Sequence, residues 1–131
     1  MIIKCITTVI PNPSAALLRT GWWHADGYLT IGKKYEVYAI QTECYDDIDA
    51  YLICDDLYDE ESYYWPLYMP TCYFEIIDSY IPSSWILSSR FPGYNGPIDL
   101  MPDNYELLLA GDLRRIKAFQ RIKNQSGINY L

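Results

Sequence analysis

Residues 35–54 read YEVYAIQTECYDDIDAYLIC. Two apolar, aromatic-rich runs, Tyr35 to Ile40 and Ala50 to Cys54, flank a polar stretch from Glu43 to Asp49. Aromatic and β-branched residues favour strands, and a polar connection between two such runs is typical of a β-hairpin. This stretch therefore predicts an antiparallel hairpin, which a tight turn at Gly32-Lys33 precedes.

Further strands are expected on both sides of the hairpin. Apolar runs rich in Ile, Val and aromatic residues, bounded by Pro, Gly or Ser, predict strands or edge segments. Strands are expected at residues 2–10, 73–78 and 84–87, a short extended piece at 28–31, and an irregular or edge segment at 67–69. Residues 91–101 contain two prolines and two glycines, which instead predict a loop.

Three stretches carry helix start and stop signals. Ser14 can cap a short helical turn over 15–19. Pro102 suits the first turn of a helix that runs from about Asp103 to Ala110. Gly111 and Asp112 then suit the end of that helix and the start of a second one, which reaches about residue 124. One face of the second helix is apolar around Ile116 and Phe119, and its other face carries Arg114, Arg115, Lys117 and Arg121.

These elements predict a mainly β, α+β protein. The expected architecture is a small bent antiparallel sheet or partly open barrel, closed on one side by one or two C-terminal helices. The length suits a single domain over 1–131, with residues 1–90 mostly β and residues 102–124 helical. The expected core residues are Tyr35, Val37, Tyr51, Ile53, Phe74, Ile76 and Trp85.

Charge is distributed very unevenly along the chain. The net charge is −7, and no Lys or Arg occurs between Tyr35 and Ser89, where twelve acidic residues lie. A surface of one sign attracts oppositely charged partners and repels nucleic acid and anionic lipid. We therefore expect a basic protein as the partner and no direct nucleic-acid ligand. The basic residues of the tail could instead form a small phosphate-binding patch, but a solvated helix face is the simpler interpretation of them.

The chain shows no secretion or membrane signal. The first eleven residues lack a long apolar core and a cleavage site, and no window approaches the roughly 20 apolar residues of a membrane span. We expect a cytoplasmic protein that does not bind a membrane, and a monomer or weak dimer. Four free thiols are expected at Cys5, Cys44, Cys54 and Cys72, because a reducing compartment disfavours disulfides.

Motifs for catalysis or cofactor binding are lacking. His24 is the only histidine and adjoins two tryptophans, so packing is a simpler explanation for it than catalysis. The acidic loops offer oxygen ligands for calcium but match no calcium-loop pattern and contain no glycine. We expect no enzymatic activity, no cofactor and no metal site.

Acidic and aromatic residues alternate in the two loops around the hairpin. Tyr and Trp are enriched at protein interfaces, where they combine large contact area with a polar group. The alternative is that these tyrosines are ordinary strand residues of a small β protein. The candidate partner-binding residues are Asp46, Asp47, Asp49, Asp55, Asp56, Tyr58, Asp59, Glu60, Glu61, Tyr63, Tyr64 and Trp65.

Several short motifs resemble those of a group of small bacterial proteins. The motifs are Leu29-Thr30-Ile31-Gly32-Lys33-x-Tyr35-x-Val37, Tyr51-Leu52-Ile53-Cys54-Asp55-Asp56, Phe74-Glu75-Ile76-Ile77-Asp78 and Pro82-Ser83-x-Trp85, with Pro70 between the second and third. The group resembles SH3-like barrels, and some members are immunity proteins encoded beside polymorphic or contact-dependent toxins. The resemblance covers roughly residues 28–87 and implies a cytoplasmic inhibitor that binds one cognate toxin domain without doing chemistry. It carries over no contact residues.

Two functional hypotheses follow. The first is an immunity protein that neutralises a toxin, for example a nuclease with a basic cleft, through an acidic and aromatic surface. The alternative is a non-catalytic adaptor or charge-mimic module that binds another basic protein. An enzyme or metal-binding protein is the least favoured class.

Overall fold

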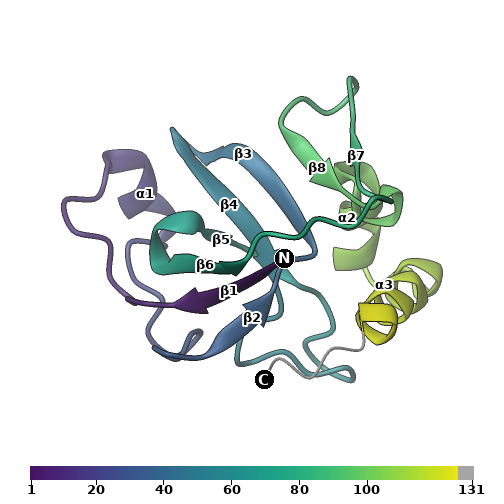
Figure 1. The fold of residues 1–131 in the computed structure, drawn as a ribbon, viewed down its shortest axis with the longest axis horizontal. Coiled ribbons are helices and arrows are strands. Elements are labelled where there is room, and N and C mark those ends of the chain that lie inside the picture. Colours follow the sequence, from purple (N-terminus) through teal and green to yellow (C-terminus); the bar gives the residue numbers. More distant parts are fainter. Residues whose placement is uncertain (127–131) are drawn as a thin grey trace.

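A three-stranded antiparallel sheet with the order β2-β1-β6 forms one layer of the molecule (Figure 1). The computed structural model describes residues 1–126. Residues 127–131 of the predicted domain lie outside the described residues. The central strand β1 (Ile2–Cys5) pairs with β2 (Lys34–Glu36) and with β6 (Phe74–Asp78). The predicted N-terminal strand therefore ends earlier than residue 10, because beyond Cys5 the chain leaves the sheet and exposes Ile6 and Val9.

The second sheet is antiparallel, has five strands and has the order β5-β4-β3-β8-β7. Its hairpin consists of β3 (Ala39–Tyr45) and β4 (Ile48–Ile53), and β5 (Leu67–Pro70) forms one edge as the flanking prolines predict. The other edge consists of β7 (Ile86–Leu87) and β8 (Tyr94–Gly96). The prediction of a continuous loop over 91–101 is wrong, because β8 pairs with β3 through Asn95 and Tyr94.

The predicted hairpin is correct in position but differs in its details. The first predicted strand of the hairpin is interrupted at Val37-Tyr38. Its first part, β2, belongs to the three-stranded sheet, and its second part, β3, belongs to the five-stranded sheet. The predicted polar loop over 43–49 is mostly strand. A register shift between Gln41 and Tyr45 accommodates the polar residues, with Glu43 and Asp46 in the left-handed region of backbone space at φ 51° and 62°.

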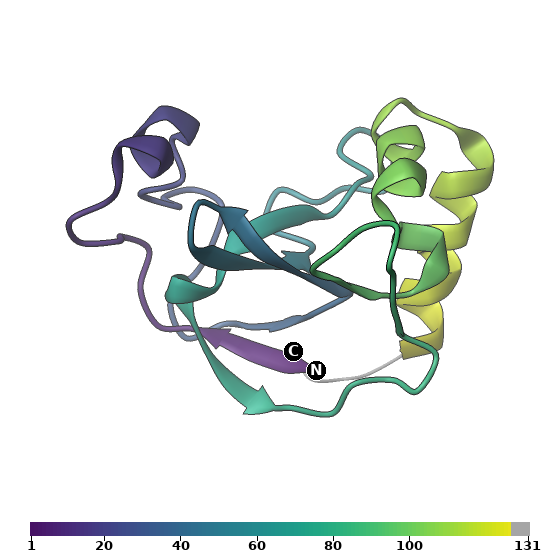
Figure 2. The same ribbon diagram turned by 90° about the horizontal axis from the view of Figure 1, so that it is seen from above.

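The helices follow their sequence signals closely. In α1 (Ala15–Thr20), Ser14 Oγ accepts a hydrogen bond from the Leu17 N–H, and Gly21 ends the helix at φ 81°. Helices α2 (Pro102–Leu109) and α3 (Leu113–Ser126) are separated by Gly111 at φ 87°. Short 3₁₀ turns, η1 (Thr71–Tyr73) and η2 (Ile98–Leu100), precede β6 and α2. Figures 1 and 2 show α1 at one end of the molecule and α2 with α3 at the other, with the sheets between them.

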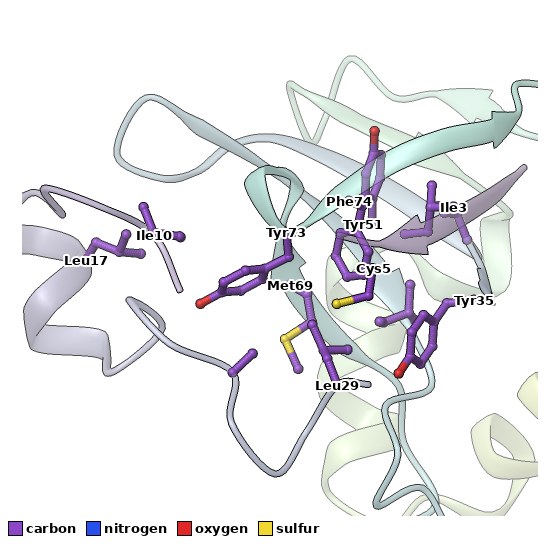
Figure 3. Close-up of a cluster of buried hydrophobic side chains, with 13 residues drawn as sticks. Ile3, Cys5, Ile10, Leu17, Leu29, Tyr35, Tyr51, Met69, Tyr73 and Phe74 are labelled. Atoms are coloured by element: carbon purple, nitrogen blue, oxygen red, sulfur yellow. The ribbon is translucent and has the colours of Figure 1, made fainter. Parts of the chain in front are cut away.

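Two hydrophobic clusters cover the two opposite faces of β4. Figure 3 shows the first cluster, in which Ile3, Tyr51, Tyr73 and Phe74 pack together. The second cluster contains Leu52 and packs against α2 and α3; its fully buried side chains include Tyr94, Leu100, Leu108 and Phe119. Both faces of β4 are thus covered, which explains its uninterrupted apolar run.

The structure confirms the α+β class, with two antiparallel sheets that do not close into a barrel and two helices near the C-terminal end of the described chain. Five of the seven predicted core residues are buried. The prediction is wrong for Ile76, which is 51% exposed, and Trp85 is only half-buried. Ile76 lies on the edge strand β6 and Trp85 lies before the two-residue strand β7, so fewer neighbours cover them.

Candidate functional site

The predicted acidic residues lie at opposite ends of one strand. Asp46 and Asp47 form the turn that leads into β4, whereas Asp55 and the residues after it follow the end of β4 (Figure 1). A strand of six residues spans roughly 20 Å. The single acidic surface expected from the sequence is therefore divided between the hairpin tip and a loop at the opposite end of β4.

The hairpin tip presents few acids to a partner. Asp46 and Asp47 are exposed. Asp49 is half-buried, and its Oδ1 accepts a hydrogen bond of 3.0 Å from the Glu43 N–H, which stabilises the irregular part of the hairpin. Asp49 is thus a structural residue, and the exposed carboxylates at the tip are those of Asp46, Asp47 and Glu43.

Asp55 is buried, contrary to the expectation of an exposed loop acid. Its exposed fraction is 4%, and neither carboxylate oxygen makes a hydrogen bond of good geometry. Burial raises the pKa of Asp55; nearby N–H groups of the turn and the Tyr63 hydroxyl offset only part of that effect, and the charge of Asp56 adds to it. A partner cannot reach this carboxylate without opening the loop.

Asp56 holds two separate segments together. Its carboxylate accepts hydrogen bonds from Lys33 Nζ at 2.8 Å, the Tyr35 hydroxyl at 2.7 Å and the Thr30 hydroxyl at 2.6 Å. Burial works to raise the pKa of Asp56, but these three donors outweigh it and lower the pKa below its ordinary value. The negative charge of Asp56 is already neutralised within the fold and contributes little to a partner's attraction.

Asp59 shapes a tight turn that presents two exposed acids. Its backbone N–H donates to the Tyr63 carbonyl at 2.9 Å, and the Tyr63 N–H donates back to the Asp59 carbonyl at 3.0 Å. Its Oδ1 accepts from the Glu61 N–H at 2.7 Å. This side-chain bond fixes the turn as Asx turns do, and leaves Glu60 and Glu61 exposed at its tip.

Three aromatic rings lie immediately beside this turn. Tyr63 stacks on Trp65 with ring centroids 4.7 Å apart, and Tyr64 meets Trp65 edge-on at 5.0 Å. All three are half-buried, and Tyr64 and Trp65 pack against the second hydrophobic cluster. We call residues 59–65 the acid–aromatic loop. It brings together six of the twelve predicted contact residues: Asp59, Glu60, Glu61, Tyr63, Tyr64 and Trp65.

Tyr58 faces inward from the loop's base. Its ring meets Phe119 of α3 edge-on at 6.1 Å, and Lys123 Nζ lies 3.9 Å from the centre of the same ring. Its hydroxyl is buried. Tyr58 therefore anchors the base of the acid–aromatic loop to α3 and is not a surface residue of that loop.

Much of the tyrosine content has a structural explanation. Several tyrosines are buried at the ring and donate from the hydroxyl to a backbone carbonyl, so they join neighbouring segments. These pairs are Tyr45 with Tyr68, Tyr73 with Trp22, Tyr94 with Pro97 and Tyr105 with Pro66. These four tyrosines thus serve the fold, although only Tyr45 and Tyr94 are strand residues as the alternative interpretation expects. The interface interpretation stays a prediction for the acid–aromatic loop.

Other chemical groups are dispersed. Within residues 1–126, no three His, Cys, Asp or Glu side chains are grouped so that they could hold a metal ion. All four cysteines are free; Cys5 is buried, Cys72 is exposed and the other two are half-buried. His24 lies 3.8 Å from Asp26 and stacks edge-on against Trp23. No helix in this part of the chain is both long and apolar enough to cross a membrane.

Sequence reasoning missed the donors that surround Asp56. Thr30 and Lys33 lie 26 and 23 residues before it, beyond the reach of any local pattern. The sequence predicts the turn at Gly32-Lys33 but does not indicate which carboxylate Lys33 contacts. The chain matches no protein-family model, and no curated protein or solved structure is significantly similar to it.

Proposed function

We propose that the protein is an immunity-type inhibitor that binds a basic protein, a cognate toxin domain, through the acid–aromatic loop and performs no chemistry. The observation that supports this best is the pairing of exposed Glu60 and Glu61 with the stacked rings of Tyr63 and Trp65 on one short turn. The resemblance of residues 28–87 to small immunity proteins favours the same function and a cytoplasmic location.

The acid–aromatic loop is organised before any partner arrives. The reciprocal backbone bonds of Asp59 and Tyr63 close the turn, and Asp59 Oδ1 fixes its tip. Tyr64 and Trp65 pack against the second hydrophobic cluster, which includes Leu108 of α2 and Phe119 of α3. A preorganised surface loses less conformational entropy on binding, so more of the contact energy is available as affinity.

The two kinds of residue would contribute to different rate constants. Exposed carboxylates accelerate the encounter with a basic surface, and salt screens that effect. Aromatic side chains that become buried in a partner's pocket slow dissociation. A nuclease cleft is a suitable target, since it must be basic to hold its substrate.

A charge-mimic module is the second candidate. The separation of the acidic residues favours it, because the hairpin tip and the acid–aromatic loop lie at the two ends of β4. Carboxylates spaced by roughly 20 Å could follow a long basic groove in an adaptor's partner. In that case both ends would contribute to binding.

The test compares two matched double variants in surface plasmon resonance with the product of the neighbouring gene, at two salt concentrations. Glu60→Lys/Glu61→Lys reverses two exposed acids of the loop, and Asp46→Lys/Asp47→Lys reverses two at the hairpin tip. Under the proposal the first pair slows association at least about tenfold and flattens its salt dependence, while the second pair changes it little. Equal losses would support the charge-mimic function.

A third variant tests the aromatic contribution. Trp65→Leu is expected to raise the dissociation rate about tenfold or more with little change in association, if the ring is an anchor. Trp65 also packs against the second hydrophobic cluster, so its replacement could unfold the protein. Urea denaturation of the same variant shows whether the fold persists. Unchanged rates in both the Glu60/Glu61 and Trp65 variants would refute the assigned surface.

A further inference from the structure

A cleft opens where the two sheets meet α3. Its volume is about 230 Å³. Its walls come from the β2–β3 link, the β6–β7 link, the residue after β8 and the last turns of α3. Ligand pockets for drug-sized molecules usually exceed 300 Å³, so this cleft suits a single side chain or a fragment and is too small for a nucleotide cofactor.

The polar groups of the cleft are acidic and aromatic. Glu36, Tyr38 and Trp85 line it, with Ser84 and Gln125 as neutral polar neighbours. None of the lining residues is a Lys or Arg. Apolar walls include Val37 and Ile122. A carboxylate and an indole ring that line the same small cleft can bind an organic cation, through charge and through the ring face.

Glu36 is not neutralised by a basic side chain within the described residues. Among the ion pairs of residues 1–126, Lys33 pairs with Asp56 and Lys4 with Glu75, and none joins a Lys or Arg to Glu36. Burial lowers the pKa of the Met1 α-amino group, and the negative charge of Glu36 offsets part of that effect. Glu36 also interacts with the Tyr38 hydroxyl. The pKa of Tyr38 is raised, chiefly by burial and in smaller part by Glu36. The half-buried carboxylate thus interacts with one partly buried ammonium group and with no Lys or Arg of residues 1–126, which favours the approach of a further cation.

We propose that this cleft binds the side chain of an arginine from another protein, with the guanidinium group at Glu36 and against the Trp85 ring. The apolar walls would hold the methylene stem, as they do for other amphipathic side chains. Arginine is preferred to lysine because its flat guanidinium stacks on aromatic rings and donates several hydrogen bonds in one plane. The cleft shares no residue with the acid–aromatic loop, so this inference goes beyond the proposed function and can fail independently of it.

The test is a titration of the ¹⁵N-labelled protein with N-acetylarginine amide, followed by NMR. The Trp85 indole N–H, identified from the spectrum of Trp85→Phe, is the reporter. We expect saturable shifts confined to the cleft, with a Kd of about 1 mM, which is usual for a ligand of this size. N-acetylcitrulline amide has nearly the same shape without the charge and is expected to bind at least tenfold more weakly.

Two matched variants localise the charge. Glu36→Gln is expected to weaken binding of N-acetylarginine amide at least fivefold. Glu43→Gln changes the net charge by the same amount but lies outside the cleft, so it should have no effect. Trp85→Leu keeps Glu36 and removes the ring, which gives a second, independent loss should Glu36→Gln disturb the fold.

Three outcomes would overturn the proposal. They are an absence of saturable shifts at the cleft, equal binding of the citrulline compound, and equal effects of the two glutamate variants. A titration with free arginine distinguishes the source of the ligand. Binding of the blocked amide at least as tight as that of free arginine supports a protein side chain, whereas clearly tighter binding of free arginine indicates a small-molecule site and contradicts the assignment to a partner protein.

Discussion

The hydroxyl group of Tyr35 donates a hydrogen bond of 2.7 Å to Oδ1 of Asp56. Tyr35 belongs to β2 of the three-stranded sheet, and Asp56 follows β4 of the five-stranded sheet. The same hydroxyl accepts a hydrogen bond from the Thr30 N–H at 2.9 Å. This chain of donors fixes the approach of the two sheets at the edge where the acid–aromatic loop begins.

Loss of the Tyr35–Asp56 bond should destabilise the fold. Tyr35 is buried and the Asp56 side chain is only 22% exposed, so water compensates poorly for a missing partner. Asp56→Asn and Tyr35→Phe are each expected to lower the free energy of unfolding by about 1–3 kcal/mol. Urea denaturation of both single variants and the double variant gives the coupling energy, which should be about 1 kcal/mol or more.

The contribution of Asp56 should depend on pH in a definite direction. Its donors lower its pKa in the folded state, so its stabilisation is present above the ordinary pKa of about 4 and is lost as pH falls through the lowered value. The stability difference between the native protein and Asp56→Asn should therefore shrink below pH 4. A difference that stays constant from pH 7 to pH 3 would contradict the role assigned to the ionised carboxylate.

Asp55 should behave in the opposite way. Burial raises its pKa, so the folded state favours the protonated form, and stability from this group is lost as pH rises through the raised value. Asp55→Asn should match the native protein near pH 3 and exceed it at pH 7 by about 1–3 kcal/mol, because a buried charge without good partners is removed. Thermal or urea unfolding across this pH range checks the prediction; a destabilised variant at pH 7 would mean that the ionised carboxylate is well satisfied.

Phe74 is the better test of the core than Trp85. Its ring is 9% exposed and lies 6.0–6.2 Å from the rings of Tyr35, Tyr51 and Tyr73. Phe74→Ala is expected to cost about 3–5 kcal/mol. The half-buried Trp85 should lose less on truncation to alanine, so a larger loss at Trp85 than at Phe74 would show that the cluster is centred elsewhere.

Gly96 is required for close packing between β8 and β3. A Cβ atom at this position would lie 2.7 Å from Ala39 Cβ and 2.6 Å from the Tyr94 hydroxyl oxygen. Gly96→Ala should therefore destabilise the protein by about 1–3 kcal/mol through overpacking. Gly27→Ala is a useful comparison, since a Cβ there meets nothing within 4 Å and only backbone strain at φ 86° remains. An unchanged stability of Gly96→Ala would exclude a specific steric role for Gly96, because its backbone is not in the left-handed region and only the close contacts can cause a loss.

The candidate site could be predicted from the sequence only in part. Glu60, Glu61 and the aromatic residues after them lie together on one loop, and their role as the contact surface stays a prediction. Asp55 and Asp56, which look equivalent in the sequence, have opposite environments, because one points into the fold and the other meets Lys33 and two hydroxyl groups. The cleft at Glu36 and Trp85 gave no local signal, since its walls come from four segments far apart in the chain.

The sequence by itself determined the features that depend on neighbouring residues. Ser14 and Gly21 delimit α1, Gly111 separates α2 from α3, and the apolar run from Ala50 to Cys54 predicts the strand β4. Only the tertiary structure decided which sheet each strand joins, so β2 leaves the predicted hairpin and pairs with β1. The physical reason is range. Caps and turns are satisfied within a few residues, whereas the pairing of β1 with β2 and the donors to Asp56 involve segments more than 20 residues apart that only the packed chain brings together.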